Sequence, residues 1–350
     1  MSSSFGQIFK ISTFGESHGA GIGVVVDGVP SGIELFREDI QKELDRRRPG
    51  QSLMTTKRSE ADQVEILSGV FRNTTTGAPI GLLIRNKDTD SSKYDAIEDL
   101  YRPGHADYTY DKKYALRDHR GGGRSSGRET ACRVAAGAIA RKMLKLKGID
   151  ILAATIQVQD VYAQKWLDDE IENNSIRTAD PDVAEEMANR VKAAMRNADS
   201  VGGVLECRVK GLPVGLGEPL YDKLDAMLAH AMFSIGTVRG LTFGNGFEAS
   251  GLLGSENNDA MEGGSFASNR CGGILGGLSN GMPIIMKIAI KPTPSIATYQ
   301  ATIDKSGQDQ KIRVEGRHDP CICPRAVPVV EAMTALVLAD AILLNKCQNW

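Results

Sequence analysis

The residues best suited to proton transfer are five histidines, most of which lie in short motifs rich in glycine or proline. His18 lies within GESHGAG (15–21), where flanking glycines allow the backbone to approach a ligand closely. Because histidine titrates near neutral pH, His18 could act as a general acid. A hydrogen-bonded histidine in a turn explains the same motif equally well, so both interpretations stay open.

A second motif, RPGHAD (102–107), places Arg102 and His105 on either side of a Pro-Gly turn. Asp107 could orient the His105 ring. An Asp-capped turn explains Pro-Gly and Asp107, but it does not explain the arginine and histidine that frame them.

The segment RDHRGGGRSSGRE (117–129) directly precedes an expected long helix. Backbone N–H groups at a helix N-terminus, together with its dipole, favour bound anions, and four arginines add to this. The spacing fits neither a dinucleotide GxGxxG nor a P-loop, whose lysine is missing. A flexible basic loop with Ser125 or Ser126 capping the helix is the alternative, and capping is compatible with anion binding.

Two further groups complete the candidate chemistry. In GRHDPCICPR (316–325), Asp319 follows Arg317 and His318 and could accept or relay a proton. The Cys321-x-Cys323 spacing differs from that of structural zinc sites, so buried thiols are favoured. The triple arginine 46–48 at a helix C-terminus offsets the helix dipole, but its planar guanidinium groups also suit carboxylates or phosphates.

Composition restricts the possible partners. Forty-two Lys and Arg against 44 Asp and Glu give a net charge of -2, so no global positive field attracts nucleic acid or membranes. A non-catalytic anion- or RNA-binding module is an alternative, but the acidic net charge and the aromatic content of 5% argue against RNA recognition by base stacking. A metal-dependent hydrolase is a third alternative, and the sequence lacks the HxxxH or paired ligand spacing typical of one. Scattered cysteines, no signal sequence, and an apolar run (327–344) that carries two acids and is too short to span a bilayer predict a soluble cytoplasmic protein.

The pattern of elements predicts an α/β chain with two similar halves. A strand at 22–26, a G-x-P-x-G turn and a helix at 38–47 are repeated by a strand at 204–209 and a helix around 224–231. We therefore expect one domain over 1–350, with a possible duplication of about 22–150 and 204–345. Further strands are expected at 64–71, 80–85, 151–158 and 284–291, and helices at 128–147, 181–197 and 327–345. Long polar segments at 46–60, 86–127 and 292–320 hold most of the candidate chemistry.

Five motifs occur in order along the whole chain, GESHGAG, RRRPGQ, YRPGHADYTY, RSSGRET and GRHDPCICPRAVPVVEAM, and with them the sequence resembles the chorismate synthase family. The resemblance implies an α/β (α+β) fold, a β-α-β sandwich with two pseudo-symmetric halves that forms a homotetramer. It also implies a lyase that binds reduced FMN beside 5-enolpyruvylshikimate 3-phosphate. This substrate loses phosphate and a C6 hydrogen to give chorismate, with no net redox change.

The resemblance also implies roles for individual residues. His18 would protonate the departing phosphate, His105 would lie at the pyrimidine edge of the flavin, and Asp319 would take a proton from flavin N5. The substrate carries two carboxylates and a phosphate, which calls for several arginines in a desolvated site. The matching substrate positions are Ser17, Arg47, Arg48 and Arg128, and the matching flavin positions are Arg102, Ser125, Ser126, Gly127, Lys291, Ser295, Arg317 and His318.

One segment, residues 235–240 (IGTVRG), departs from the family pattern I-N/P-A-V-K-G. No recognised nucleotide fingerprint is present in the sequence. We therefore expect the flavin to be reduced by an external reductant rather than by NADPH bound to this chain.

Overall fold

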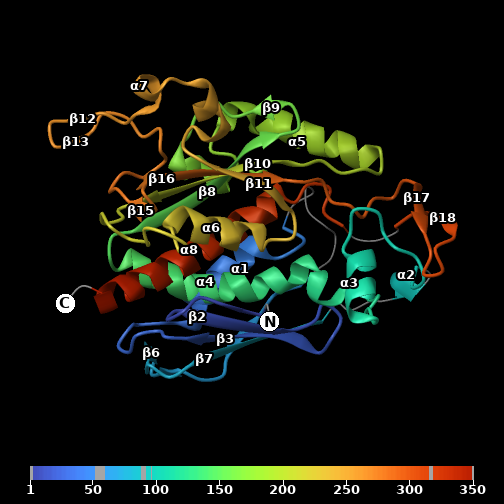
Figure 1. Cartoon of the computed structure of the whole chain (residues 1–350). Helices are drawn as coiled ribbons and strands as arrows, with labels where there is room; N and C mark the ends of the chain where they lie inside the picture. The colour runs from blue at the N-terminus through green and yellow to red at the C-terminus, as the bar shows by residue number, and fades with distance from the viewer. Residues whose placement is uncertain (1–2, 52–59, 88–91, 96, 315–317, 349–350) are drawn as a thin grey trace.

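The structure, a computed structural model, describes residues 3–51, 60–87, 92–95, 97–314 and 318–348. It contains two five-stranded antiparallel sheets with a layer of helices between them (Figure 1). The first sheet has the order β1-β2-β3-β7-β4, and the second has the order β11-β16-β10-β8-β9. The predicted β-α-β sandwich of the α/β class is therefore confirmed.

The two sheets share one connectivity. In the first, β2 (Lys10–Gly15) and β3 (Gly21–Asp27) pair, and β7 (Ile80–Arg85) lies between β3 and β4 (Val64–Ile66). In the second, β8 (Asp150–Val158), β10 (Gly203–Lys210), β16 (Ile284–Ile290) and β11 (Val238–Phe243) follow the same order. Each half therefore places its third central strand at the edge of the sheet and its fourth inside. Gene duplication as the origin of this match stays a prediction.

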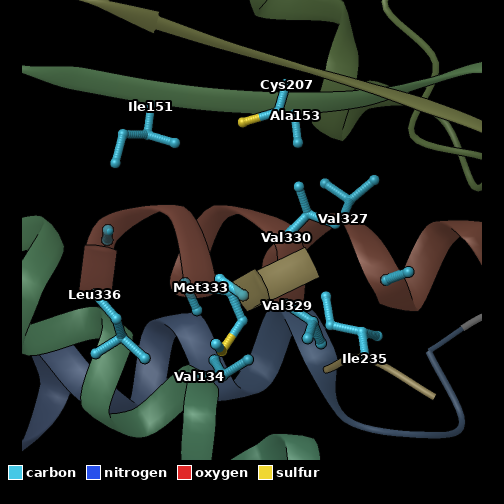
Figure 2. Packing of buried hydrophobic residues seen from close by; sticks show 14 of the residues in the cluster. Val134, Ile151, Ala153, Cys207, Ile235, Val327, Val329, Val330, Met333 and Leu336 are labelled. Carbon is cyan, nitrogen blue, oxygen red and sulfur yellow. The ribbon is translucent and has the colours of Figure 1, made fainter. Parts of the chain in front are cut away.

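The central layer consists of α1 (Arg37–Arg47), α4 (Thr130–Lys145), α6 (Leu224–Phe233) and α8 (Cys323–Gln348). The helix α8 packs on α4 and α6 and also against β8 and β10. Figure 2 shows Val327 and Val330 pointing toward Ala153 and Cys207 of the second sheet, while Met333 lies near Val134 of α4. A single hydrophobic cluster thus continues from one sheet through the helices to the other.

Close helix contact depends on one glycine. A Cβ atom built on Gly137 of α4 would lie only 2.4 Å from the Cβ of Ala332 in α8. The first turns of the two helices lie at the same end of the layer, where both line one cavity. The backbone contact therefore fixes how both helices approach the site.

The helix α8 is the one described helix that is long and apolar enough to cross a membrane, and 78% of its most apolar window is buried inside the fold. From the sequence, the apolar run 327–344 was expected to be too short to span a bilayer. That expectation was wrong about the length, because the helix that contains the run begins at Cys323 and covers 26 residues. Burial between the sheets identifies α8 as a core helix.

A buried charge cluster connects α8 to three other elements. The Glu331 carboxylate accepts hydrogen bonds from Arg46 (2.6 Å) and Arg141 (2.9 Å), and from the backbone N–H of Ala153 in β8 (2.9 Å). Burial alone would raise the pKa of Glu331, but the two guanidinium groups outweigh it and hold that pKa below its usual value. Arg46 therefore binds carboxylates within the fold and does not line the ligand cavity described below.

A second carboxylate on α8 holds the start of the chain. Asp340 accepts hydrogen bonds from the backbone N–H groups of Gln7 (2.8 Å), Ile8 (2.7 Å) and Phe9 (2.9 Å). Asp340 is buried, so these bonds satisfy a charge that the core would otherwise disfavour.

Several elements differ from expectation. The strand expected at 64–71 is broken by a turn, because Gly69 adopts a left-handed conformation between β4 and β5 (Val70–Phe71). The long polar segments contain structure of their own: α2 (Ser92–Asp95), α3 (Asp107–Tyr114), β17 (Gln300–Ile303) and β18 (Asp309–Ile312), grouped at one end of the fold (Figure 1). The helix α5 (Pro181–Arg196) packs on β8 and β9 outside the sandwich.

The remaining described elements are short, and residues 244–283 form an excursion between β11 and β16 that carries several of them. They are β1 (Ser4–Phe5), β6 (Thr74–Thr75), β9 (Val161–Tyr162), β12 (Met261–Glu262), β13 (Ser265–Phe266), β14 (Ile274–Leu275), β15 (Leu278–Ser279) and α7 (Gly254–Asn257), with 3-10 turns η1 (Gly123–Ser125), η2 (Gly127–Glu129), η3 (Asp168–Asn173) and η4 (Gly246–Gly251).

Candidate active site

A cavity of about 1460 Å³ lies where the first turns of α4 and α8 meet the C-terminus of α1. Most residues predicted from the sequence motifs line it, although they come from segments up to 300 residues apart. They are Ser17, His18, Arg47, Arg102, His105, Ser125, Ser126, Gly127, Arg128, Lys291, Ser295, His318 and Asp319.

The charge of the cavity differs from that of the whole chain. Nine arginines and one lysine line the cavity against five carboxylates, a local excess of five positive charges in a chain of net charge -2. The N-terminal ends of two helices add partial positive charge at the same place. The cavity is therefore suited to a ligand with several negative charges.

His18 is held by its neighbours on two sides. Its Nδ1 lies 3.2 Å from the Oγ of Ser17, and its ring meets the Tyr94 ring edge-on at a centroid distance of 5.5 Å. A Cβ atom at Gly121 would lie 2.0 Å from His18 Cε1, and Gly121 has a φ of +63°. Any side chain at position 121 would displace the ring, so the glycine-rich loop packs directly against the imidazole.

His105 belongs to a buried network. The Asp107 carboxylate accepts two hydrogen bonds from Arg102 (2.7 and 2.8 Å) and lies 2.9 Å from His105 Nδ1. A neutral ring that donates to this carboxylate carries its proton on Nδ1, although Arg102 Nη2 also lies 3.1 Å from the same nitrogen. Burial lowers the pKa of His105, and the bond to Asp107 only partly opposes this effect, so the surroundings favour the neutral ring. Although burial disfavours the Asp107 charge, hydrogen bonds from Arg102 and His105 hold its pKa far below the usual value.

Arg47 and Arg128 meet at a carboxylate that the motifs did not indicate. Asp62 bonds Arg47 Nη1 through Oδ2 (3.1 Å) and Arg128 Nη1 through Oδ1. Burial and repulsion from Arg325 lower the pKa of Arg47 to about 9. The Nη2 group of Arg128 is buried without a hydrogen-bond partner among the described residues. A buried unpaired donor on the wall of a cavity indicates a place for a ligand oxygen.

Asp319 and His318 lie together at the start of α8. Arg325 donates a hydrogen bond to Asp319 at 2.5 Å, and the same guanidinium bonds the carbonyl of Arg47 (3.1 Å). Burial, together with the positive charge of Arg102, lowers the pKa of His318 to about 4. Among the described residues, its buried Nε2 has no hydrogen-bond partner.

The glycine-rich loop offers backbone groups and hydroxyls to a ligand. Ser126 caps the turn before α4 by accepting a bond from the Arg128 N–H, and Ser125 donates to the carbonyl of Gly122. On the other wall, Lys291 donates to the carbonyl of Gly104 at 2.7 Å, and burial lowers the pKa of Lys291. These groups, with Ser295 and the unpaired His318 Nε2, fit a flavin that carries a phosphate and a polar ring edge.

The segment 235–240 forms part of the same wall. Ile235, Gly236, Thr237 and Arg239 line the cavity, and the Thr237 carbonyl accepts a bond from the Lys291 N–H at 3.0 Å. Its departure from the family pattern therefore lies at the ligand cavity itself.

Two of the predicted site residues are not seen among those that line the cavity. Arg48 is exposed at the cap of α1, 3.9 Å from Asp45, and does not line the cavity. Arg317 lies outside the described residues. Of the two histidines not assigned a role from the sequence, His119 lines the cavity and lies 3.1 Å from Asp95, whereas His230 packs against Phe5 away from the site.

The chain was compared with known families, curated proteins and solved structures. A profile of the chorismate synthase family matches residues 9–343. The chain is 54% identical to a chorismate synthase of Agathobacter rectalis, covering 98% of this chain and 95% of that protein. It is 53% identical to one of Methanosarcina mazei, with 99% and 97% coverage. A crystal structure of chorismate synthase superimposes with a TM-score of 0.78 at 31% identity, covering 97% of this chain and 93% of the other.

Proposed function

Because the chain belongs to the chorismate synthase family of lyases, as its motifs predict, we propose that it converts 5-enolpyruvylshikimate 3-phosphate to chorismate. The reaction is a 1,4-anti-elimination in which the C3–O bond to phosphate breaks, C6 loses a hydrogen and a new double bond forms. The observation that carries the proposal is the excess of five positive charges in a cavity that also gathers four of the five histidines.

Substrate anions would be held where the arginines meet. Arg128 has a free Nη2 donor, and Arg47 contributes a second guanidinium beside it. Ser17 is buried next to His18 and offers a hydroxyl. Bidentate guanidinium contacts are well suited to carboxylates and phosphate in a site shielded from water. Arg48 remains a weaker candidate, because its side chain is exposed outside the cavity.

His18 would give a proton to the departing phosphate. The phosphate leaves with an added negative charge, and an adjacent acid lowers the barrier by neutralising it. Contacts with Ser17, Tyr94 and the Gly121 backbone restrict the ring to one orientation. A positioned ring of this kind is what general acid catalysis requires.

His105 and Asp319 would serve the cofactor side of the cavity. The neutral His105 ring, with Nδ1 directed at Asp107, presents Nε2 as a hydrogen-bond acceptor. Asp319 would accept the proton that originates at C6, with Arg325 stabilising the carboxylate beforehand. These assignments follow the family pattern and are supported by the placement of both residues at the cavity.

Reduced FMN, when bound, supplies transient electron donation that helps the substrate to release phosphate, and it ends the cycle unchanged. Arg102, Ser125, Ser126, Gly127, Lys291, Ser295 and His318 are the described residues that would hold it.

We further propose a homotetramer that works in the cytoplasm with an external flavin reductant. Support for self-association comes from the outer face of the first sheet, where the apolar side chains of Phe14 and Val25 are exposed in the part of the chain that the structure describes. Exposed apolar sheet faces commonly mark subunit interfaces. Light scattering of the purified protein would test the oligomeric state, and a monomer at micromolar concentration would contradict it.

The decisive assay measures phosphate release from 5-enolpyruvylshikimate 3-phosphate. Release should occur with reduced FMN under anaerobic conditions and should not occur with oxidised FMN. His18→Ala and His105→Ala should keep tight binding of the substrate and slow turnover severely. Phosphate release with oxidised flavin, or none under any condition, would contradict the proposal. Adding NADPH and FMN without another reductant tests the reductase expectation, for which we predict no turnover.

A further inference from the structure

Asp62 lies in the segment between α1 and β4, outside all the sequence motifs that contain predicted site residues. Its side chain is fully buried and touches the two arginines that are placed to hold the substrate. We propose that Asp62 is a positioning residue that holds the guanidinium groups of Arg47 and Arg128 side by side for the anionic groups of the substrate. This inference rests on the function proposed above.

The hydrogen-bond pattern shows how one carboxylate binds two guanidinium groups at once. Asp62 Oδ2 accepts a hydrogen bond from Arg47 Nη1, and Asp62 Oδ1 accepts one from Arg128 Nη1, so each oxygen binds one arginine. The other Arg47 donors bond Thr130 Oγ1 (3.1 Å) and the Gly127 carbonyl. Arg128 Nε bonds Asn86 Oδ1 at 2.9 Å. After these bonds, Arg128 Nη2 is the donor left over, at the cavity.

Charge gives a second reason for a carboxylate at this position. Arg47 is fully buried, and Arg128 and Arg325 both repel it. Without a negative group between them, two adjacent buried cations would separate, or one would lose its proton. Although burial raises the pKa of Asp62, the attraction of Arg47 and Arg128 is greater and keeps that pKa below its usual value. The carboxylate therefore stays charged and balances the pair.

The backbone around Asp62 is held in an uncommon conformation. Asp62 has a φ of +44°, in the left-handed region that non-glycine residues seldom adopt. The side chain of Gln41 in α1 donates to the Asp62 carbonyl (3.3 Å) and accepts from the Val64 N–H (3.1 Å). Helix α1 thus carries Arg47 directly and fixes its partner Asp62 through Gln41.

The test is Asp62→Asn in the full-length protein. An amide keeps the shape but turns an N–H donor toward one guanidinium and removes the charge. We expect the dissociation constant for 5-enolpyruvylshikimate 3-phosphate, measured calorimetrically with saturating oxidised FMN, to rise about 10- to 100-fold. The dissociation constant for FMN alone should stay within about twofold, since Asp62 contacts none of the residues assigned to the flavin except through Arg47 and Gly127.

The two dissociation constants together separate positioning from simple structural support. Destabilisation alone would weaken the binding of both ligands. Loss of the carboxylate that holds Arg47 and Arg128 should weaken substrate binding selectively.

Two further variants complete the experiment. Asp160→Asn removes a carboxylate paired with Arg190 on the surface and should leave both dissociation constants unchanged. Gln41→Leu loosens the Asp62 loop without touching the buried pair, and it should weaken substrate binding about two- to fivefold. If Asp62→Asn does not fold, the Gln41→Leu result decides, and an unchanged substrate affinity overturns the inference.

The outcomes also separate this inference from the proposed function. A parent protein that releases phosphate, with an Asp62→Asn variant whose substrate affinity stays within twofold, overturns the role of Asp62 alone. Equal losses of substrate and flavin affinity overturn it as well, because they indicate a collapsed site. A parent that binds no 5-enolpyruvylshikimate 3-phosphate overturns both proposals.

Discussion

Gly121→Ala tests whether the glycine-rich loop determines the place of the His18 ring. The new Cβ would lie 2.0 Å from His18 Cε1 and 2.1 Å from Nδ1, whereas ordinary contacts begin at 3.4 Å. Because the obstructing atoms belong to a side chain rather than to the backbone, the ring can move away by more than about 1 Å. Folding should therefore survive, with a cost of about 1–2 kcal/mol for placing alanine at a φ of +63°.

The rate should suffer much more than the stability. A displacement of about 1 Å in a catalytic group lowers turnover by roughly 100-fold, and general acid catalysis as a whole contributes about 100- to 10,000-fold. We expect kcat for anaerobic phosphate release to fall roughly 100-fold. Substrate affinity should change less, because Asp62, which lies outside this loop, bonds both Arg47 and Arg128.

Gly148→Ala is the matched control. Gly148 has a similar φ of +76°, but a Cβ there meets no atom within 4 Å. Both variants should lose about the same unfolding free energy in urea titrations, and only Gly121→Ala should lose rate. A Gly121→Ala enzyme with kcat within threefold of the parent, or equal rate losses in both variants, would refute the role given to the loop.

Three other predictions concern stability. Burial lowers the pKa of His318 to about 4, so between pH 6.5 and pH 4 the unfolded chain binds a proton at this residue that the folded chain does not bind. Stability present above pH 6.5 should therefore be lost as the pH falls toward 4, and urea titrations of His318→Gln should show about 3 kcal/mol less of this loss. Gly137→Ala should lower the unfolding free energy by about 1–3 kcal/mol through its clash with Ala332, with Gly254→Ala, which meets nothing, as the control in thermal melts. Glu331→Gln removes the buried one of the two carboxylates that Arg46 and Arg141 share, the other being Glu43, and should cost about 1–3 kcal/mol in denaturant titrations. No measurable loss would contradict the cluster's role.

Periodicity predicted the elements whose burial is regular. The helices α1, α4, α5 and α6 and the strands β3, β7, β8, β10 and β16 lie within a few residues of their expected ranges. The start of α8 was predicted four residues late, at 327 instead of 323, because Pro324 and Pro328 suggest a helix boundary. Near the start of a helix, however, a proline removes few backbone hydrogen bonds, so the helix can begin before both. The strands β2 and β11 were missed, because glycines and polar residues interrupt their alternation.

The site was predicted as far as its residues lie in glycine-rich motifs. Within the triple arginine, Arg47 continues the buried face of Ile40 and Leu44, while Arg48 has left the helix with an extended backbone. That distinction depends on the last helical residue, which sequence patterns place poorly. Asp62 had no local signal, since its partners are 15 and 66 residues away and only the folded chain brings them together.

The two carboxylates of α8 have a consequence for synthesis on the ribosome. Glu331 joins β8, α1 and α4, and Asp340 binds residues 7–9, which are synthesised more than 330 residues earlier. The helix that fills the space between the two sheets is synthesised after every described strand of both sheets. The first half must therefore remain incomplete for most of its synthesis, with an apolar sheet face that chaperones would recognise. Premature termination before residue 323 should yield chains that aggregate rather than a stable half-protein.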